Sequence, residues 1–237
     1  MLLFSRVASP SASPSKVMPW AADITQFVNA NSTLQVSCWS GTFGYPIGTL
    51  IWSSFVESLD ALSTATAALI AQDGYIQRLD AAAELITTPG QDFLRQVVYG
   101  SPSEPPPMGA IGTVTSATAL VDRMADAVGW GVEIAQYLEG LMGNPIGVLT
   151  DVYGQMGQIT WIGVVPDAAA ADAARAKLGA DAGYIGRLAG TKDLFIPGSG
   201  HIGQVTRIGR LVAITTWIAG AESGAGHPSP SRRHRYR

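Results

Sequence analysis

The chain has little of what disulfide, metal and phosphate chemistry need. Its 237 residues include one cysteine, Cys38, and three histidines. A single cysteine excludes an intrachain disulfide and fits a reducing compartment, and no cysteine–histidine spacing is typical of a zinc site. The sequence contains neither a G-x-S-x-G elbow nor the G-x-x-x-x-G-K-[ST] spacing of a phosphate-binding loop. No common catalytic motif therefore assigns a reaction.

Charge and long apolar runs are also scarce. Charged residues make up 14% of the chain against 47% apolar, and the net charge is -3, so a large core is possible but a general attraction to nucleic acid is not. No apolar run approaches the ~20 residues that span a bilayer, and the apolar start is too short for a signal-peptide core. We expect a cytoplasmic protein. The low charge also indicates surface buried against a partner, such as a second copy.

What the chain does contain is an internal repeat. Residues 48–86 align with residues 157–195 without a gap, and 14 of the 39 paired positions are identical by direct count. The run G-Y-I-x-R-L occurs in both copies, and a second match with a slightly different offset pairs Trp20 with Trp130. Such a period predicts two similar units of about 110 residues each.

Each unit is predicted to have the ferredoxin-like order β-α-β-β-α-β. Hydrophobic periodicity and turn residues place the strands at 2–7, 34–40, 49–56 and 92–99, then at 111–116, 146–153, 158–165 and 202–208. The expected helices of the first unit are 20–28, with Pro19 in its first turn, and a long helix that Ser58 or Asp60 caps and that runs to about Leu79 or Leu85, interrupted near Gly74. Those of the second unit are 117–140 and one that begins after the cap Asp167. Repeated Pro and Ser at 9–15 oppose regular structure.

The domain boundaries follow from the repeat and from composition. We predict repeat 1 at 1–100, a Pro-rich linker at 101–109, repeat 2 with an extra apolar segment at 110–219, and a disordered basic tail at 220–237. The tail has four of the chain's 15 basic residues in its last six positions. It could contact an anionic partner, such as RNA or anionic lipid, or serve only solubility.

The strand that carries a tryptophan in each unit is apolar on both faces. Trp52 and Ile51 illustrate this in the first unit, and Trp161 and Ile162 in the second. A sheet with two apolar faces is covered on both. Because the helices of such a unit cover one face only, we expect the two sheets to pack against each other.

The element order, the unit length and the G-Y-I-x-R-L run resemble the dimeric α/β-barrel superfamily over residues 2–208. That superfamily includes cofactor-free monooxygenases, haem-degrading enzymes, chlorite-dismutase-like proteins and NIPSNAP-type domains. The resemblance implies an α+β fold in which two tandem ferredoxin-like repeats form an intrachain pseudo-dimeric barrel. It matches no family signature for a reaction, and fold analogy is a weak guide to function.

The repeated aromatic and basic residues are the candidate ligand-pocket residues. The tryptophans could wall a pocket for a planar ligand, or they could anchor the core of each unit. Each Tyr–Arg pair shares one helix face and could bind an anionic ligand, or the Tyr could pack while the Arg reaches water. The set comprises Trp20, Trp52, Trp130, Trp161, Tyr75, Tyr184, Arg78 and Arg187.

His201 is the one histidine outside the tail, at the start of the last predicted strand. Histidine can act as a general base or as a metal or haem ligand, and the alternative is a plain surface residue. Haem-binding members of the superfamily use an axial histidine, so haem stays open, although no cofactor and no metal site is predicted. Cys38 has no basic neighbour in sequence and is expected to be buried and inert.

Two functions follow as hypotheses. The first is a small-molecule-binding barrel, a cofactor-independent monooxygenase acting on an aromatic or polyketide-like compound, with His201 as base in a cavity that excludes water. The alternative is a non-enzymatic assembly module that oligomerises or docks on a partner through its surface and Arg-rich tail. A lumen lined by His201 and a further polar group would favour the first, and a lumen plugged by Trp and Leu would remove it.

Overall fold

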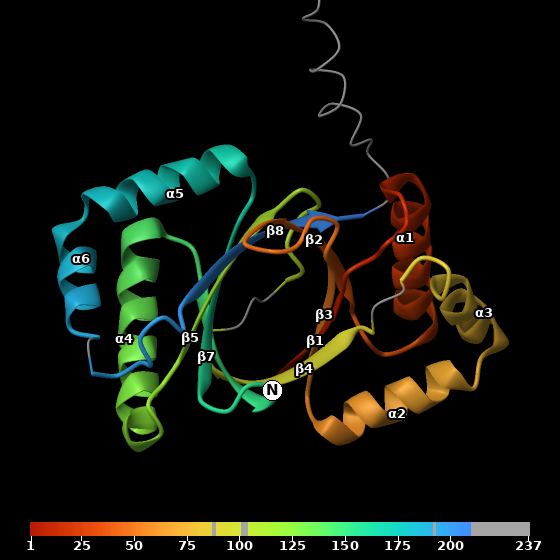
Figure 1. The fold of residues 1–237 in the computed structure, drawn as a ribbon, viewed down its shortest axis with the longest axis horizontal. Helices are drawn as coiled ribbons and strands as arrows, with labels where there is room; N and C mark the ends of the chain where they lie inside the picture. Colours follow the sequence, from red (N-terminus) through yellow and green to blue (C-terminus); the bar gives the residue numbers. More distant parts are fainter. Residues whose placement is uncertain (87–88, 101–103, 192, 210–237) are drawn as a thin grey trace, which may run out of the picture.

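The computed structural model describes residues 1–86, 89–100, 104–191 and 193–209 (Figure 1). The first half contains β1 (Leu2–Ala8), α1 (Pro14–Asn31), β2 (Ser37–Phe43), β3 (Leu50–Val56), α2 (Leu59–Ile70), α3 (Asp73–Ala82) and β4 (Gln91–Tyr99). The second half contains β5 (Ile111–Thr118), η1 (Val121–Arg123), α4 (Met124–Met142), β6 (Ile146–Tyr153), β7 (Gln158–Val165), α5 (Ala168–Ala180), α6 (Ala182–Ala189) and β8 (His201–Ile208). The predicted strand and helix order is present in both halves.

The strands form one closed antiparallel barrel in the order β1-β3-β2-β8-β5-β7-β6-β4. Each half contributes four adjacent strands, and β2–β8 and β4–β6 pairs join the halves. The two sheets face each other as expected, but they are also hydrogen-bonded along both edges. The space between them is consequently a barrel lumen rather than the core of a sandwich. Register shifts occur at both seams, where irregular pairing helps a sheet to curve.

The helices cover the outside of the barrel on two opposite sides, α1–α3 on one and α4–α6 on the other (Figure 1). Side chains alternate across each strand. In β3, Leu50 and Trp52 belong to the core beneath the helices, whereas Ile51 and Ser53 line the lumen. The apolarity of both strand faces is thereby explained, because one face meets helices and the other meets the lumen.

Several boundaries differ from the predicted ones. Helix α1 begins at Pro14, within the Pro/Ser stretch expected to be irregular, and Pro19 lies inside the helix rather than in its first turn. A proline at the first helical position loses no hydrogen bond, so Pro14 can start the helix. The predicted interruption near Gly74 is present, since α2 ends at Ile70 and α3 begins at Asp73. Strand β2 runs three residues later than predicted.

Other local predictions are confirmed. The side chain of Asp167 accepts a hydrogen bond from the Ala170 amide at 2.8 Å, and Ser58 accepts one from Ala61 at 3.1 Å, as caps do. Strands β6 and β7 have the predicted bounds. In the described part of the chain no helix is both long and apolar enough to cross a membrane. The apolar segment 211–218 and the basic tail lie outside the described residues.

Candidate functional site

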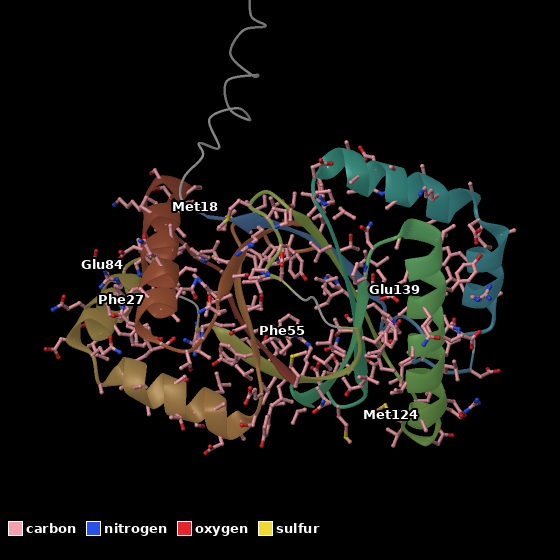
Figure 2. All side chains as sticks on the ribbon, turned by 180° about the vertical axis from the view of Figure 1, so that it is seen from behind. Met18, Phe27, Phe55, Glu84, Met124 and Glu139 are labelled. Atoms are coloured by element: carbon pink, nitrogen blue, oxygen red, sulfur yellow. The ribbon has the colours of Figure 1, made fainter. Side chains whose placement is uncertain are left out.

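Two cavities follow from this architecture. The lumen cavity, inside the barrel, has a volume of about 690 Å³. The helix-side cavity, between the outer sheet face of the first half and α1–α3, has a volume of about 590 Å³. In Figure 2, Phe55 lies inside the ring of strands, whereas Phe27 lies on α1, outside it. Both volumes are in the range of small-molecule sites.

Three of the predicted pocket residues line the helix-side cavity: Trp20 from α1, Trp52 from β3 and Tyr75 from α3. The two indole rings meet edge to face, with centroids 5.7 Å apart and an interplanar angle of 80°. Trp20 donates its indole N–H to the Arg78 carbonyl at 2.8 Å, and Trp52 donates to Thr25 Oγ1 at 2.9 Å. Because both indole donors are satisfied, the rings are held in place and present apolar surface.

The charged side chains that line this cavity are Arg6 and Asp92. Arg6 donates from Nε and Nη2 to the two Asp92 oxygens at 2.8 and 2.7 Å, and both side chains are about half exposed. Hydrogen bonding to Asp92, and to a lesser degree the nearby Tyr75, raises the pKa of Arg6. The pair is close to neutral as a whole, and it adds a carboxylate and a guanidinium to an otherwise apolar cavity.

The second half has the same tryptophan pair, but a third ring packs on it. Trp130 and Trp161 meet edge to face at 5.8 Å, and Phe195 lies 5.6 Å from the first ring and 6.0 Å from the second. Trp161 donates its N–H to the Gly131 carbonyl at 2.9 Å. Trp130 and Trp161 therefore pack with Phe195 in the core under α4 and line neither of the two cavities.

Phe195 has a structural counterpart in the first half, Ile86. The amide of Leu120 donates to the carbonyl of Leu194, at 2.9 Å, and the amide of Ser11 donates to that of Leu85, at 3.0 Å. The same backbone hydrogen bond thus fixes the residue just before each of them. Among the described residues, no third aromatic ring contacts the Trp20–Trp52 pair as Phe195 contacts the other pair.

The remaining predicted basic residues hold helices together. Arg78 forms an ion pair with Asp23 at 2.7 Å, and its guanidinium lies 4.3 Å from the Phe27 ring centre. Arg187 lies 3.8 Å from the Tyr137 ring centre. Arg78 thus contacts α1, Arg187 contacts α4, and neither arginine lines a cavity. Tyr184 is half-buried in the second core, where burial raises the pKa of its phenol.

His201 lines the lumen cavity, on the opposite face of the barrel wall from the tryptophans. Its ring meets that of Tyr45 edge to face at 5.6 Å. The lumen is also lined by Arg95 and Tyr45, which the sequence pattern does not mark as site residues. The lumen is therefore polar in part and open rather than plugged by Trp and Leu. The structure does not bring His201 together with the tryptophans.

The missed residues left weak signals in the sequence. Arg95 sits at an inward position of a predicted strand, where a charged side chain needs a partner, and Tyr45 lies in a stretch that reads as a turn. Cys38 is buried as expected. No cluster of three or more His, Cys, Asp or Glu side chains in the described ranges could hold a metal ion.

No protein-family model and no curated protein matches the chain significantly. Solved structures do match. A protein of Fusobacterium nucleatum subsp. nucleatum, provisionally named a monooxygenase, superposes with a TM-score of 0.67 and 10% identity over 89% of this chain and 98% of its own. An anthrone oxidase-like protein gives 0.64 and 13%, over 87% and 91%.

A third such structure, from Lactobacillus acidophilus and also provisionally named a monooxygenase, gives a TM-score of 0.62 with 8% identity over 87% of this chain and 93% of its own. At these identities the likeness concerns architecture alone. It extends across nearly the whole length of each chain, both halves included. The chain therefore shares the fold of these structures, a closed eight-stranded barrel with helices on its outside.

Proposed function

We propose that the protein binds a flat, uncharged aromatic compound in the helix-side cavity and oxidises it as a cofactor-independent monooxygenase. The observation that carries this proposal is the contrast between the two tryptophan pairs. One pair is covered by Phe195, and the other borders a cavity of about 590 Å³. A ligand ring beside Trp20 and Trp52 would take the place that Phe195 takes in the second half.

The chemistry of the walls favours an aromatic, uncharged ligand. The indole donors are already paired, and Thr25 is both an acceptor from Trp52 and a donor to the Ala21 carbonyl at 2.6 Å. Beside the two indoles, away from Arg6, a charged group of the ligand would lose hydration without gaining a partner. An aromatic ring would gain edge-to-face contacts with two indoles, each such pair being worth about 0.5–1.5 kcal/mol beyond burial.

Asp92 is the base in this proposal. It borders the same cavity as the tryptophans, whereas His201 does not. A methylene that is conjugated with a ketone through aromatic rings, as in anthrone, would give a proton to the Asp92 carboxylate, and Arg6 would stabilise the enolate oxygen. The resulting carbanion would reduce dioxygen, which supplies the new oxygen atom. Each turnover would convert one methylene group and one O₂ into one carbonyl group and one H₂O.

The names of the three similar solved structures support the type of reaction in this proposal, since two are provisionally named monooxygenases and one is anthrone oxidase-like. We further propose that the two halves descend from one duplicated unit. After duplication one unit would have kept its ligand cavity, and the other would have closed it with Phe195 to become a structural half. Residues 1–100 and 110–219 would then be the two units.

The direct test uses anthrone as substrate. The full-length protein should accelerate oxygen consumption and anthraquinone formation over the uncatalysed rate. Ile86→Phe, which copies Phe195 into the first half, should abolish the acceleration while the protein stays folded. The matched control Phe195→Ile should keep it. If Ile86→Phe is folded and as active as the wild type, the helix-side cavity is not the active site.

A further inference from the structure

We propose that the lumen cavity is a second, separate ligand site, and that it takes a flat compound carrying a phenolic, enolic or quinone oxygen. The lumen lies on the other face of the barrel wall from the helix-side cavity. Its walls combine apolar side chains, such as Val114 and Ile162, with a group of hydrogen-bonding side chains. The inference does not depend on the proposed oxidation.

Two glycines leave the room that the Tyr45 side chain occupies in the lumen. A Cβ atom at Gly41 would lie 2.8 Å from Cβ of Tyr45, and one at Gly203 would overlap the Tyr45 ring. Only glycine at these positions leaves room for the phenol against the barrel wall. Burial raises the pKa of Tyr45, more than the nearby charge of Arg95 lowers it. Tyr45 therefore stays protonated near neutrality and can donate a hydrogen bond to a ligand.

Arg95 is a fixed donor in the same lumen. Its Nε donates to Oδ1 of Asp151 at 2.8 Å, and its guanidinium lies 4.8 Å from the Phe93 ring centre. The Asp151 side chain is 1% exposed, and its other oxygen accepts from the Gln155 amide at 3.0 Å. Asp151 thus holds Arg95 in place and offsets its charge. No partner for either Nη atom is found among the described residues.

A row of three further polar residues crosses neighbouring strands of the lumen wall. Ser116 on β5 pairs with His201 on β8 and with Thr160 on β7. Thr160 is 2% exposed, and its Oγ1 has no hydrogen-bond partner in the described part of the chain. A buried hydroxyl without a partner costs about 1–3 kcal/mol. An oxygen or hydroxyl of a ligand in the lumen would supply the missing hydrogen bond.

These groups together select the ligand chemistry. Arg95 and Tyr45 donate, Asp151 offsets the charge of Arg95, and Glu104 adds a carboxylate to the lining, so a polarised oxygen suits the site better than a full carboxylate. The apolar walls and the aromatic rings of Tyr45 and Phe93 favour a flat hydrocarbon body. Phenols, enols and quinones combine both properties.

The test compares two probes of similar shape, 2-naphthol and naphthalene, by fluorescence titration of the full-length protein. Tyr45→Phe and Thr160→Val remove one hydroxyl each with little change of shape. Each should weaken 2-naphthol binding about three- to tenfold, the usual effect of losing one hydrogen bond, and leave naphthalene binding unchanged. Val114→Trp, which fills the lumen, should remove 2-naphthol binding there.

The two sites can be told apart with Ile86→Phe. That variant should weaken naphthalene binding in the helix-side cavity and leave the lumen contribution to 2-naphthol binding intact. If Tyr45→Phe and Thr160→Val are folded and bind 2-naphthol as the wild type does, the lumen site is refuted. If Ile86→Phe leaves naphthalene binding unchanged, the proposed function fails instead, and the lumen site stands.

Discussion

Ile86 and Phe195 follow leucines fixed by the same backbone hydrogen bond, yet only Phe195 lays a ring against its tryptophan pair. The two positions are thus a natural comparison within one molecule. One position holds an isoleucine and the other a phenylalanine, and the packing around the two tryptophan pairs differs accordingly. The two substitutions that exchange these side chains, Phe195→Ile and Ile86→Phe, should change the free energy of unfolding in opposite directions.

We expect Phe195→Ile to lower the free energy of unfolding by about 1–3 kcal/mol, because a half-buried ring with two aromatic contacts is lost. Ile86→Phe should leave the free energy of unfolding unchanged or raise it by up to about 1 kcal/mol. Chemical denaturation followed by tryptophan fluorescence measures both. A large loss of stability in Ile86→Phe would mean that the first half cannot accept a ring at this position.

Asp92→Asn tests the role of Asp92 as the base, because it should lower activity without destabilising the fold. The Arg6–Asp92 pair is about half exposed, and exposed pairs contribute about 0–1 kcal/mol, so unfolding should change little. Turnover of anthrone should fall by at least about 100-fold, the usual contribution of a general base, while KM stays similar. Steady-state oxygen consumption measures both parameters, and Asp23→Asn, at the Arg78 pair outside the cavity, is the control. Unchanged kcat in Asp92→Asn would exclude Asp92 as the base.

The Arg95–Asp151 pair should behave as a buried pair. Its side chains are 14% and 1% exposed. Removing one partner of a buried pair costs about 3–5 kcal/mol, since the other charge loses its compensation. We therefore expect Asp151→Leu to destabilise strongly, and the double variant Asp151→Leu with Arg95→Met to recover much of the loss. Additive losses in this double-mutant cycle would contradict direct pairing.

The fold could be predicted from sequence further than the site could. The alternation around Trp52, the caps Ser58 and Asp167, and the two apolar strand faces are local signals, and each is confirmed. Which face of a strand meets a ligand depends on contacts between residues that are far apart in the sequence. Trp52 and Trp161 look alike in sequence, but a residue 34 positions later in each copy, Ile86 or Phe195, differs in its contact with the pair.

The lumen site was missed for a related reason. The Tyr45 ring fits at its position because Gly203, far away in the chain, leaves space for it. His201 was found because histidine is rare here, but a single residue type does not reveal which cavity it faces. The pairing of β2 with β8 determines both relationships, and it joins segments about 160 residues apart, which periodicity cannot detect.

Cys38 should be unreactive in the folded protein. It is 3% exposed, and burial raises its pKa to about 12. The thiolate is the reactive form, so thiol reagents at pH 8 should modify Cys38 only after unfolding. The raised pKa also means that this group contributes stability below pH about 9, which is lost as the pH rises towards 12. Thiol titration with and without denaturant, and unfolding of Cys38→Ala between pH 8 and 11, test this.

The two seams of the barrel have a consequence for assembly. If only residues 1–100 were produced, β2 and β4 would each be left with unsatisfied amides and carbonyls along one side. Two such fragments could pair about a two-fold axis, with β2 of each beside β4 of the other, and restore a ring of eight strands with two helix-side cavities. Sedimentation of that fragment should accordingly reveal a homodimer, with twice the ligand capacity per ring of the intact polypeptide.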